Sequence, residues 1–404
     1  MRITYISNDR GFLSIHCHEI ISHCAKRGHA VTLIMPGDVA LSLSLNAAVR
    51  QKRIPVLFKN DILAEAAFQA LACFSLLISM LSLSRPHLIY ARQNYAGLGP
   101  IVLARIFKIA YMAEVNGIIQ SRGRGFSVRH KVKQILEYAC LKNAPAIVVP
   151  SAFLRSRIAR QFSIPAERIS IIPNGVNPAV FFPRNDAQET RAECGFSEND
   201  FVVGFIGSMG TWQGIEILKS AILHMRNRHD CSECRFLIAG DYAPDARYSS
   251  MRQGQGQGRK DIVSFIADNN LAGIVHYAGF VTYEQSARYM NAADVLVAPY
   301  TRAYLSAGGG SPMKLYAYLA SGRPAIITDL GDFTDATELA ERRAAHLIAP
   351  DSAEQLVLGI ATLKENASLA KEIAENGREW AIKHRTWAIA ADKIAGIYQS
   401  LLHN

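Results

Sequence analysis

The stretch GGGSPMKLYAYLASGRPAIIT, residues 308–328, combines a glycine-rich loop, a marked helix start and a following strand. Ser311 is expected to cap the helix with its hydroxyl, and Pro312 suits the first helical position, where its missing N–H has no intrahelical partner to lose. Gly322 is placed to end the helix in a left-handed turn, and residues 325–328 read as a short apolar strand. This order of loop, helix and strand is typical of an α/β domain.

The first turn of that helix carries a lysine, Lys314. A cation is mildly unfavourable at this end, because the helix dipole is positive there. The unpaired N–H groups of the same turn favour an anion. An anionic ligand would explain the lysine, whereas the alternative is an ordinary capped helix with a solvent-exposed lysine.

Length and composition indicate a globular protein of two domains. At 404 residues the chain is too long for one typical core and suits two domains of about 200 residues each. Half of its residues are hydrophobic. It begins with a charged residue and an apolar strand, without the apolar core and cleavage site of a signal peptide, so a cytoplasmic protein is expected.

Cysteine usage fits a reducing compartment. The seven cysteines are scattered, apart from Cys231 and Cys234, and show no disulfide framework. The one pair lacks a second pair of ligands at metal-binding spacing. No metal site is therefore expected.

The positive charge is concentrated in the first half of the chain. Residues 1–176 contain 22 Lys and Arg against 8 Asp and Glu, and the remainder contains 22 against 26. This asymmetry suggests an anionic partner, such as a membrane surface or a phosphorylated acceptor. Nucleic acid is disfavoured, because no helix-turn-helix, zinc-finger or RNP pattern is present. A solvated basic face without a partner is the remaining interpretation.

The opening of the chain predicts a parallel sheet. A strand at 3–7 leads through the loop Asn8-Asp9-Arg10-Gly11 into a helix at about 14–27 and a second strand at 30–35. A β-α-β unit of this length requires parallel strands, whose carboxyl ends border ligand sites. The loop is not a GxGxxG fingerprint, so a nicotinamide or flavin cofactor is disfavoured.

Two further stretches of the first half suggest a membrane surface. Residues 66–83 are 18 residues without a formal charge, and we interpret them as a buried or partly membrane-facing helix rather than a span. A basic run follows later, either as an interfacial patch or as a solvated loop and helix face. It consists of Arg122, Arg124, Arg129, His130, Lys131 and Lys133.

The second half repeats the α/β alternation. The turn Pro173-Asn174-Gly175-Val176 separates the two regions. An apolar strand at 201–206 then runs into GSMGTWQG before a helix, so that a glycine loop again meets a helix start. Further strands are expected at 235–239, 275–277 and 295–299.

Taken together, the motifs resemble the family 4 retaining glycosyltransferases of GT-B fold, and their order and spacing match over essentially the whole chain. They are Pro173-Asn174-Gly175-Val176, Phe181-Phe182-Pro183, Gly204-Phe205-Ile206-Gly207-Ser208, Trp212-Gln213-Gly214, Gly279-Phe280-Val281, Ala293-Asp294-Val295 and Ser311-Pro312-Met313-Lys314-Leu315-Tyr316.

The resemblance implies an α/β protein with two Rossmann-like domains facing each other across a cleft. Residues 1–176 would form the acceptor-side domain and residues 177–385 the donor domain. Residues 386–404 would form a helix crossing back to the first domain. The implied reaction moves a sugar, with retention, from a nucleoside-diphosphate sugar to a glycan or lipid-linked acceptor in surface or extracellular polysaccharide biosynthesis. No cofactor or metal is expected. The charge asymmetry and the apolar residues 66–83, not the resemblance, predict that this cytoplasmic protein is peripheral on the inner face of the plasma membrane.

The resemblance also implies site residues. No catalytic residue is assigned, because front-face attack needs no carboxylate nucleophile. The diphosphate would contact Gly207, Ser208, Ser311, Pro312, Lys314 and Arg302. The base and ribose would contact Gly279, Phe280, Val281, Tyr283 and Ala317. The acceptor side would include Asp9, Arg10, Gly11, Asn116, Gly117, Arg122 and Arg124.

Four positions depart from the family pattern. Gly309 and Ala317 replace two glutamates that stand eight residues apart, Gln213 replaces a lysine, with Arg302 as the candidate substitute, and Asn116 replaces a histidine. A weak or inactive transferase-like partner subunit is therefore an alternative. A sugar-nucleotide epimerase of GT-B fold is a further one, against which the Ser311–Lys314 motif argues.

Overall fold

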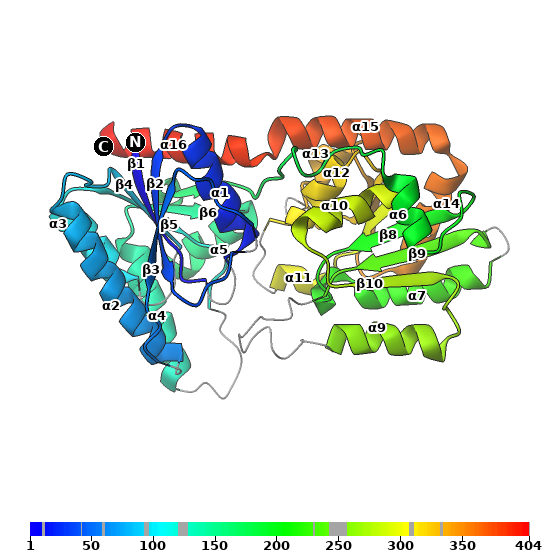
Figure 1. Cartoon of the computed structure of the whole chain (residues 1–404), viewed down its shortest axis with the longest axis horizontal. Coiled ribbons are helices and arrows are strands. Elements are labelled where there is room, and N and C mark those ends of the chain that lie inside the picture. The colour runs from blue at the N-terminus through cyan, green and yellow to red at the C-terminus, as the bar shows by residue number, and fades with distance from the viewer. Residues whose placement is uncertain are drawn as a thin grey trace. The chain divides into compact units, whose positions relative to one another are not determined.

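A computed structural model of the chain describes residues 1–9, 13–41, 43–58, 61–92, 97–119, 128–228, 231–241, 257–306, 311–331 and 334–403. These residues form two compact units, each with its own sheet (Figure 1). The first comprises the described residues of Met1–Asn174 and Trp387–Asn404. The second comprises those of Gly175–Ala307 and Ser311–Thr386.

The first unit contains a seven-stranded sheet of order β3-β2-β1-β4-β5-β6-β7, in which every pairing is parallel. Most of its strands are predominantly apolar because helices cover both faces, whereas the edge strand β3 (Val49–Ile54, VRQKRI) carries exposed polar and charged side chains. The strands are β1 (Arg2–Ile6), β2 (Ala30–Pro36), β3 (Val49–Ile54), β4 (Leu88–Arg92), β5 (Ala110–Glu114), β6 (Ala146–Val149) and β7 (Ile169–Ile171).

Helices form a layer on each face of this sheet. One core lies under α2 (Asp61–Met80), α3 (Leu98–Ile106), α4 (Val128–Asn143) and α5 (Ala152–Phe162). The other lies under α1 (Ile15–Lys26) and α16 (Trp387–His403), which pack against each other. The last helix of the chain is therefore part of the first unit. A short 3-10 helix, η1 (Ala166–Arg168), precedes β7.

The second unit has a six-stranded parallel sheet of order β10-β9-β8-β11-β12-β13. Successive strand residues alternate between two cores, so this unit also has three layers. Its strands are β8 (Phe201–Ile206), β9 (Cys234–Ala239), β10 (Val275–Gly279), β11 (Val295–Ala298), β12 (Ala325–Thr328) and β13 (His346–Ile348). Its helices are α6 (Ala187–Glu193), η2 (Thr211–Gln213), α7 (Ile215–Arg226), α9 (Gln257–Asp268), α10 (Tyr283–Ala292), α11 (Ala303–Ser306), α12 (Met313–Ala320), α13 (Ala336–Glu341), α14 (Ala353–Glu365) and α15 (Ala367–His384).

The helix expected after Ser311 is α12, and its start differs in detail from the prediction. The helix begins at Met313, with Pro312 in the capping position and no side-chain cap, so the expected cap by Ser311 is wrong. The Ser311 hydroxyl instead lies 2.9 Å from the Tyr316 hydroxyl. The end of the helix is as predicted, because Gly322 has a φ of 71° in the left-handed region.

Candidate functional site

Each sheet reverses its strand order at one point, and parallel sheets bind ligands at the carboxyl edge of such points. In the second unit the reversal lies between β8 and β11. Gly207 follows β8 directly, and Pro299 and Tyr300 follow β11. Residues 207 and 208, predicted to contact the diphosphate, therefore lie at the expected edge.

Two glycines at this edge allow the backbone segments to approach closely. A Cβ on Gly240, whose φ is 120°, would lie 2.1 Å from the carbonyl oxygen of Gly207. A Cβ on Gly214, whose φ is 79°, would lie 1.8 Å from the carbonyl oxygen of Pro299. Any side chain at these positions would collide with backbone, so only glycine is compatible with this edge.

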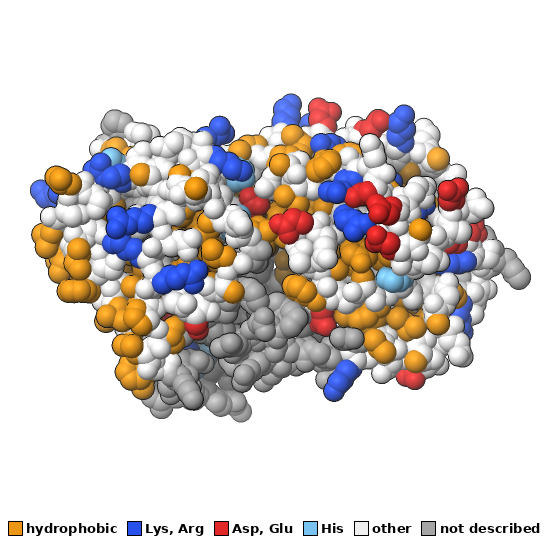
Figure 2. All heavy atoms as spheres, viewed as in Figure 1, with side chains coloured by type: hydrophobic (Ala, Val, Ile, Leu, Met, Phe, Trp, Pro, Cys, Tyr) orange, Lys and Arg blue, Asp and Glu red, His pale blue; other side chains and the backbone are white. Residues whose placement is uncertain are grey.

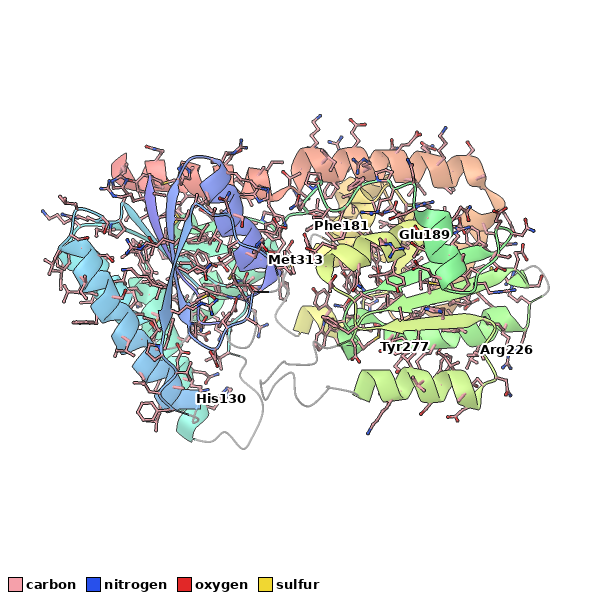
Figure 3. The ribbon with its side chains drawn as sticks, in the orientation of Figure 1. His130, Phe181, Glu189, Arg226, Tyr277 and Met313 are labelled. Atoms are coloured by element: carbon pink, nitrogen blue, oxygen red, sulfur yellow. The ribbon has the colours of Figure 1, made fainter. Side chains whose placement is uncertain are left out.

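Lys314 lies beneath the same edge, in the first turn of α12. Figure 3 labels Met313, the first residue of this helix. The Lys314 Nζ is 4.1 Å from the centroid of the Phe205 ring and 4.9 Å from that of Tyr300. A Cβ on Gly207 would lie 2.8 Å from the Lys314 Cδ and 3.5 Å from its Nζ. The lysine stem thus runs directly under the glycine that follows β8.

The head of Lys314 is buried although its residue as a whole is only half-buried. Among the described residues Nζ has no hydrogen-bond partner, only the faces of aromatic rings. Burial lowers the pKa of Lys314 to about 7. Burying an amine without a hydrogen bond costs free energy. An anion bound next to Nζ would reduce this cost, because it would supply a hydrogen-bond acceptor and the opposite charge.

A hydrogen-bonded chain holds Ser311, which lies two residues before α12. The Tyr316 hydroxyl donates to Asp335 Oδ2 at 2.9 Å, so the Ser311 hydroxyl donates to the Tyr316 oxygen. Arg385 in turn donates to Asp335 Oδ1 at 2.6 Å. Burial raises the pKa of Tyr316, which keeps its proton on the phenol. Hydrogen bonds through Tyr316 and Asp335 thereby fix the position of the Ser311 side chain.

The other residues predicted at the diphosphate are placed differently. The Gln213 side-chain amide donates to the Ser208 Oγ at 3.4 Å. Arg302 is 74% exposed in its side chain and pairs with Asp351, Nε to Oδ2, at 3.5 Å. The structure therefore holds Arg302 in a surface ion pair, and its role as a substitute cation stays a prediction.

The residues predicted at the base and ribose follow β10 and lie on α12. Gly279 ends β10 with a φ of 71°, Phe280 is half-exposed, and Val281 packs against the core. Tyr283 opens α10, and its ring meets that of Phe181, labelled in Figure 3, at 5.0 Å. Ala317, on α12, is 6% exposed and belongs to the same hydrophobic core.

In the first unit the strand order reverses between β1 and β4. Asp9, just beyond β1, pairs with Arg92 at the end of β4, Oδ1 to Nη1, at 2.5 Å. Asp9 Oδ2 also accepts from the backbone N–H of Ser14, which caps α1. The predicted acceptor-side residue Asp9 is therefore held across the reversal point by a charge-assisted contact.

A buried carboxylate, Glu114, organises the end of β5. It is 1% exposed, its Oε2 accepts from the Tyr5 hydroxyl at 2.7 Å, and its Oε1 accepts from Asn116 Nδ2 at 2.6 Å. His16 Nε2 lies 3.0 Å from the same Oε1. Burial alone would raise the pKa of Glu114, but His16, Arg92 and the Tyr5 hydroxyl together lower it to about 2. The carboxylate is fully engaged, which suits positioning rather than proton transfer.

Sequence reasoning missed Glu114, His16 and Arg92. The available signal was a single carboxylate at the end of the apolar strand AYMAE, in a half of the chain that has few acids. Asn116 and Gly117 follow that strand as predicted by position. Four other predicted acceptor-side residues and Gly309 lie outside the described residues. The four are Arg10, Gly11, Arg122 and Arg124.

Within the described part of the chain no group of three or more His, Cys, Asp or Glu side chains is arranged to hold a metal ion. The seven cysteines are free thiols. Burial raises the pKa of Cys234 to about 12, so it stays protonated at neutral pH.

Comparisons with known proteins identify the class. Residues 13–180 match the family model of Glycosyltransferase Family 4, and residues 200–366 match that of Glycosyl transferases group 1. An uncharacterised glycosyltransferase of Methanocaldococcus jannaschii is 21% identical over 402 residues, which span 96% of this chain and 94% of that protein.

Solved structures share the fold of the whole chain. The sucrose-phosphate synthase of Thermosynechococcus elongatus has a TM-score of 0.75 at 19% identity, covering 100% of this chain and 99% of that one. Anabaena HepE, solved with UDP, has a TM-score of 0.72 at 18% identity, covering 99% and 100%. HepE was also solved with UDP-glucose.

Two Rossmann-like units with these neighbours define the GT-B fold. The chain belongs to the family 4-like glycosyltransferases of this fold. The predicted fold class and family are confirmed. The roles of the individual site residues stay predictions.

Proposed function

We propose that this glycosyltransferase moves a sugar, with retention of the anomeric configuration, from a nucleoside-diphosphate sugar to a glycan or lipid-linked acceptor. One observation carries the proposal. The amine of Lys314 is buried without a hydrogen-bond partner among the described residues, directly under the glycine edge at the reversal point of the second sheet.

A diphosphate matches what this edge offers. The first turn of α12 has no side-chain cap and presents the positive end of the helix dipole, and Lys314 adds a cation from the same turn. The similarity to Anabaena HepE, a structure solved with UDP-glucose, supports a nucleotide-sugar donor. The carboxyl end of β10, with Phe280 half-exposed, is the proposed place of the base.

These groups would act on the leaving diphosphate. As the bond between the anomeric carbon and the diphosphate oxygen breaks, negative charge builds on that oxygen. The acceptor hydroxyl oxygen bonds to the same face of the anomeric carbon and passes its proton to the departing diphosphate oxygen. Preorganised N–H groups and a cation stabilise developing charge more than the ground state, which lowers the barrier. We assign this neutralisation to Lys314 and the α12 start rather than to a metal.

The acceptor is assigned to the carboxyl edge of the first sheet. Asp9 and Asn116 lie beyond β1 and β5, and both are held by part-buried contacts, Asp9 with Arg92 and Asn116 with Glu114. The basic balance of this half of the chain fits a phosphorylated or lipid-linked acceptor. A role in building a surface polysaccharide is the corresponding biological proposal.

Isothermal titration calorimetry with UDP, GDP and ADP tests the donor. We expect micromolar binding of one nucleotide, with the other two much weaker. Its binding should weaken in Lys314→Met and stay unchanged in Lys371→Gln, which removes an exposed cation on α15. Millimolar binding of all three would reject the donor assignment and favour the partner-subunit alternative.

Turnover separates an enzyme from a binding subunit. The nucleotide sugar that carries the preferred base is incubated with candidate lipid-linked and glycan acceptors, and released nucleoside diphosphate is measured. Acceptor-dependent release supports transfer. Tight nucleotide binding with no release for any acceptor or sugar would identify a binding subunit.

A further inference from the structure

The helix α2 exposes an uninterrupted apolar stripe. Leu63, Phe74, Ile78 and Leu81, on this helix and just beyond it, are 52%, 61%, 53% and 74% exposed. They recur at spacings that place them on one side of the helix. The opposite side is fixed, because the side chains there are buried in the core against the first sheet. These are Phe68, Ala72, Leu76 and Met80.

The apolar surface continues over the neighbouring helices. α2 packs on α3, and α3 packs on α4, whose first turn contains His130, labelled in Figure 3. Figure 2 shows hydrophobic side chains along the edge of the first unit that α2 forms. The exposed members on the adjoining elements are Leu83, Val102, Ile106, Val132 and Ile135. We call these residues, with the α2 stripe, the α2–α4 face.

The charges on the α2–α4 face have one sign. The exposed cations on α3 and α4 and on the turns that follow α2 and α3 are Arg85, Arg105, Lys108, Lys131 and Lys142. The two glutamates whose side chains are described on these helices, Glu65 and Glu137, are each 6% exposed and turned inward. Among the described side chains of the three helices, the face therefore presents cations and no exposed carboxylate.

An apolar surface of this extent marks an interaction site rather than ordinary exposure. The positive charge of the exposed lysines and arginines indicates which kind of partner binds there. A second copy of the same face would oppose like charges, which disfavours a symmetric dimer. An anionic lipid surface satisfies both features, because headgroups pair with the lysines and arginines while the apolar side chains enter the acyl boundary.

We infer that the α2–α4 face docks the protein on an anionic lipid bilayer, with α2 lying in the plane of the interface. The stretch Leu63–Met80 is long and apolar enough to cross a membrane, with a mean hydropathy of 1.7, but 44% of it is buried. A span would expose the strands that its inner side covers. The inference stands independently of the proposed sugar transfer.

Vesicle sedimentation of the full chain tests the surface. At low salt we expect binding to phosphatidylglycerol vesicles and none to phosphatidylcholine vesicles. The double variant Phe74→Ser with Ile78→Ser should bind roughly tenfold or more weakly, because two large apolar side chains no longer enter the interface. The double variant Lys108→Gln with Lys131→Gln should lose about fivefold for each cation.

Matched controls change the same chemistry elsewhere. Leu358→Ser alters a 47% exposed leucine on α14 of the second unit, and Lys26→Gln removes an exposed cation on α1, which covers the other face of the first sheet. Both should bind vesicles like the unchanged protein. Thermal unfolding confirms that every variant is folded, and calorimetry with UDP reports the donor site separately.

Three results would overturn the inference. They are an absence of binding to phosphatidylglycerol at low salt, unchanged binding by both double variants, and equal binding to neutral vesicles. Sedimentation velocity tests the alternative that a second copy of the chain binds the α2–α4 face. A dimer in solution that Phe74→Ser and Ile78→Ser dissociate would assign the face to a second copy instead.

Discussion

Replacing Lys314 with methionine is expected to separate the two effects of this residue, one on ligand binding and one on stability. Methionine keeps the length and the contacts of the stem but removes the charge and the hydrogen-bond donors. Burial places the pKa of Lys314 at about 7, against 10.5 for a free lysine. The unliganded protein therefore holds Lys314 largely neutral above pH 7.

A bound diphosphate would return the proton to Lys314 by supplying opposite charge. Below pH 7 the lysine is already charged, and a charge-assisted hydrogen bond is worth roughly 1.5–3 kcal/mol, about ten- to a hundredfold in affinity. Above pH 7 binding must take up a proton, so the affinity of the unchanged protein falls about tenfold for each pH unit. Near pH 9 it should approach that of Lys314→Met.

Stability should change in the opposite direction. Because the folded pKa of Lys314 lies below its unfolded value, the unfolded chain binds a proton that the native state lacks between pH 7 and 10.5. The buried lysine therefore lowers the free energy of unfolding by its full amount below pH 7. This destabilisation becomes smaller as the pH rises from 7 to 10.5. The cost is on the order of 5 kcal/mol at most, at about 1.4 kcal/mol per pKa unit. Lys314→Met should therefore be more stable than the unchanged protein at pH 7.

The assay is calorimetry with UDP at several pH values from 6 to 9, each in two buffers of different ionisation enthalpy. The buffer pair measures proton uptake directly. The ligand phosphate titrates in the same way in experiments with either protein. The difference in proton uptake between the unchanged protein and Lys314→Met therefore reports the lysine alone. Urea unfolding at pH 7 and pH 10 measures stability. Equal affinities at pH 6, or no difference in proton uptake at pH 8, would refute the assignment of Lys314 to the diphosphate.

Three further substitutions probe the two sites. Gly207→Ala places a Cβ 2.8 Å from the Lys314 Cδ, so it should weaken UDP binding about tenfold, measured by calorimetry, with little further loss in Lys314→Met. Ala317→Glu should tighten UDP binding roughly tenfold by restoring a carboxylate acceptor for the ribose hydroxyls. Glu114→Ala should lower the free energy of unfolding at pH 7 by about 3–5 kcal/mol in urea titrations, because His16 and two hydrogen-bond donors lose their buried partner.

Each of these has an outcome that contradicts it. Additive losses in the Gly207 and Lys314 double variant would mean that the two residues act separately. A less stable Ala317→Glu without tighter binding would show that position 317 faces the core and not the ribose. The pKa of Glu114, about 2 and below its unfolded value of 4.5, makes its contribution present above pH 4.5 and lost toward pH 2. A stability difference for Glu114→Ala that stays constant from pH 7 to pH 2 would exclude this account.

The amino-acid sequence alone determined the architecture and the family. Strands of parallel sheets are buried on both faces, so they appear as short apolar runs, and the helices between them carry local start and stop signals. The strand at 201–206, the glycine loop after it and the helix ended by Gly322 are patterns of this local kind. Their order along the chain was sufficient for the resemblance.

The tertiary structure alone decided how the polar residues are paired. Tyr5 and Glu114 are 109 residues apart, Asp9 and Arg92 are 83 apart, and no local signal connects them. Sequence periodicity also placed Ser311 as a helix cap, whereas its hydroxyl is used by Tyr316 because α12 brings the two together.

Lys314 shows which properties follow from the sequence and which follow from the tertiary structure. The sequence located the lysine at a positive helix end, but the direction of its head depends on the rings of Phe205 and Tyr300, which belong to other strands and loops. Local patterns determine which residues reach the carboxyl edge of a sheet. Long-range packing determines whether a side chain there contacts solvent, a hydrogen-bond partner or an aromatic ring. These contacts set its protonation state and the kind of ligand it can bind.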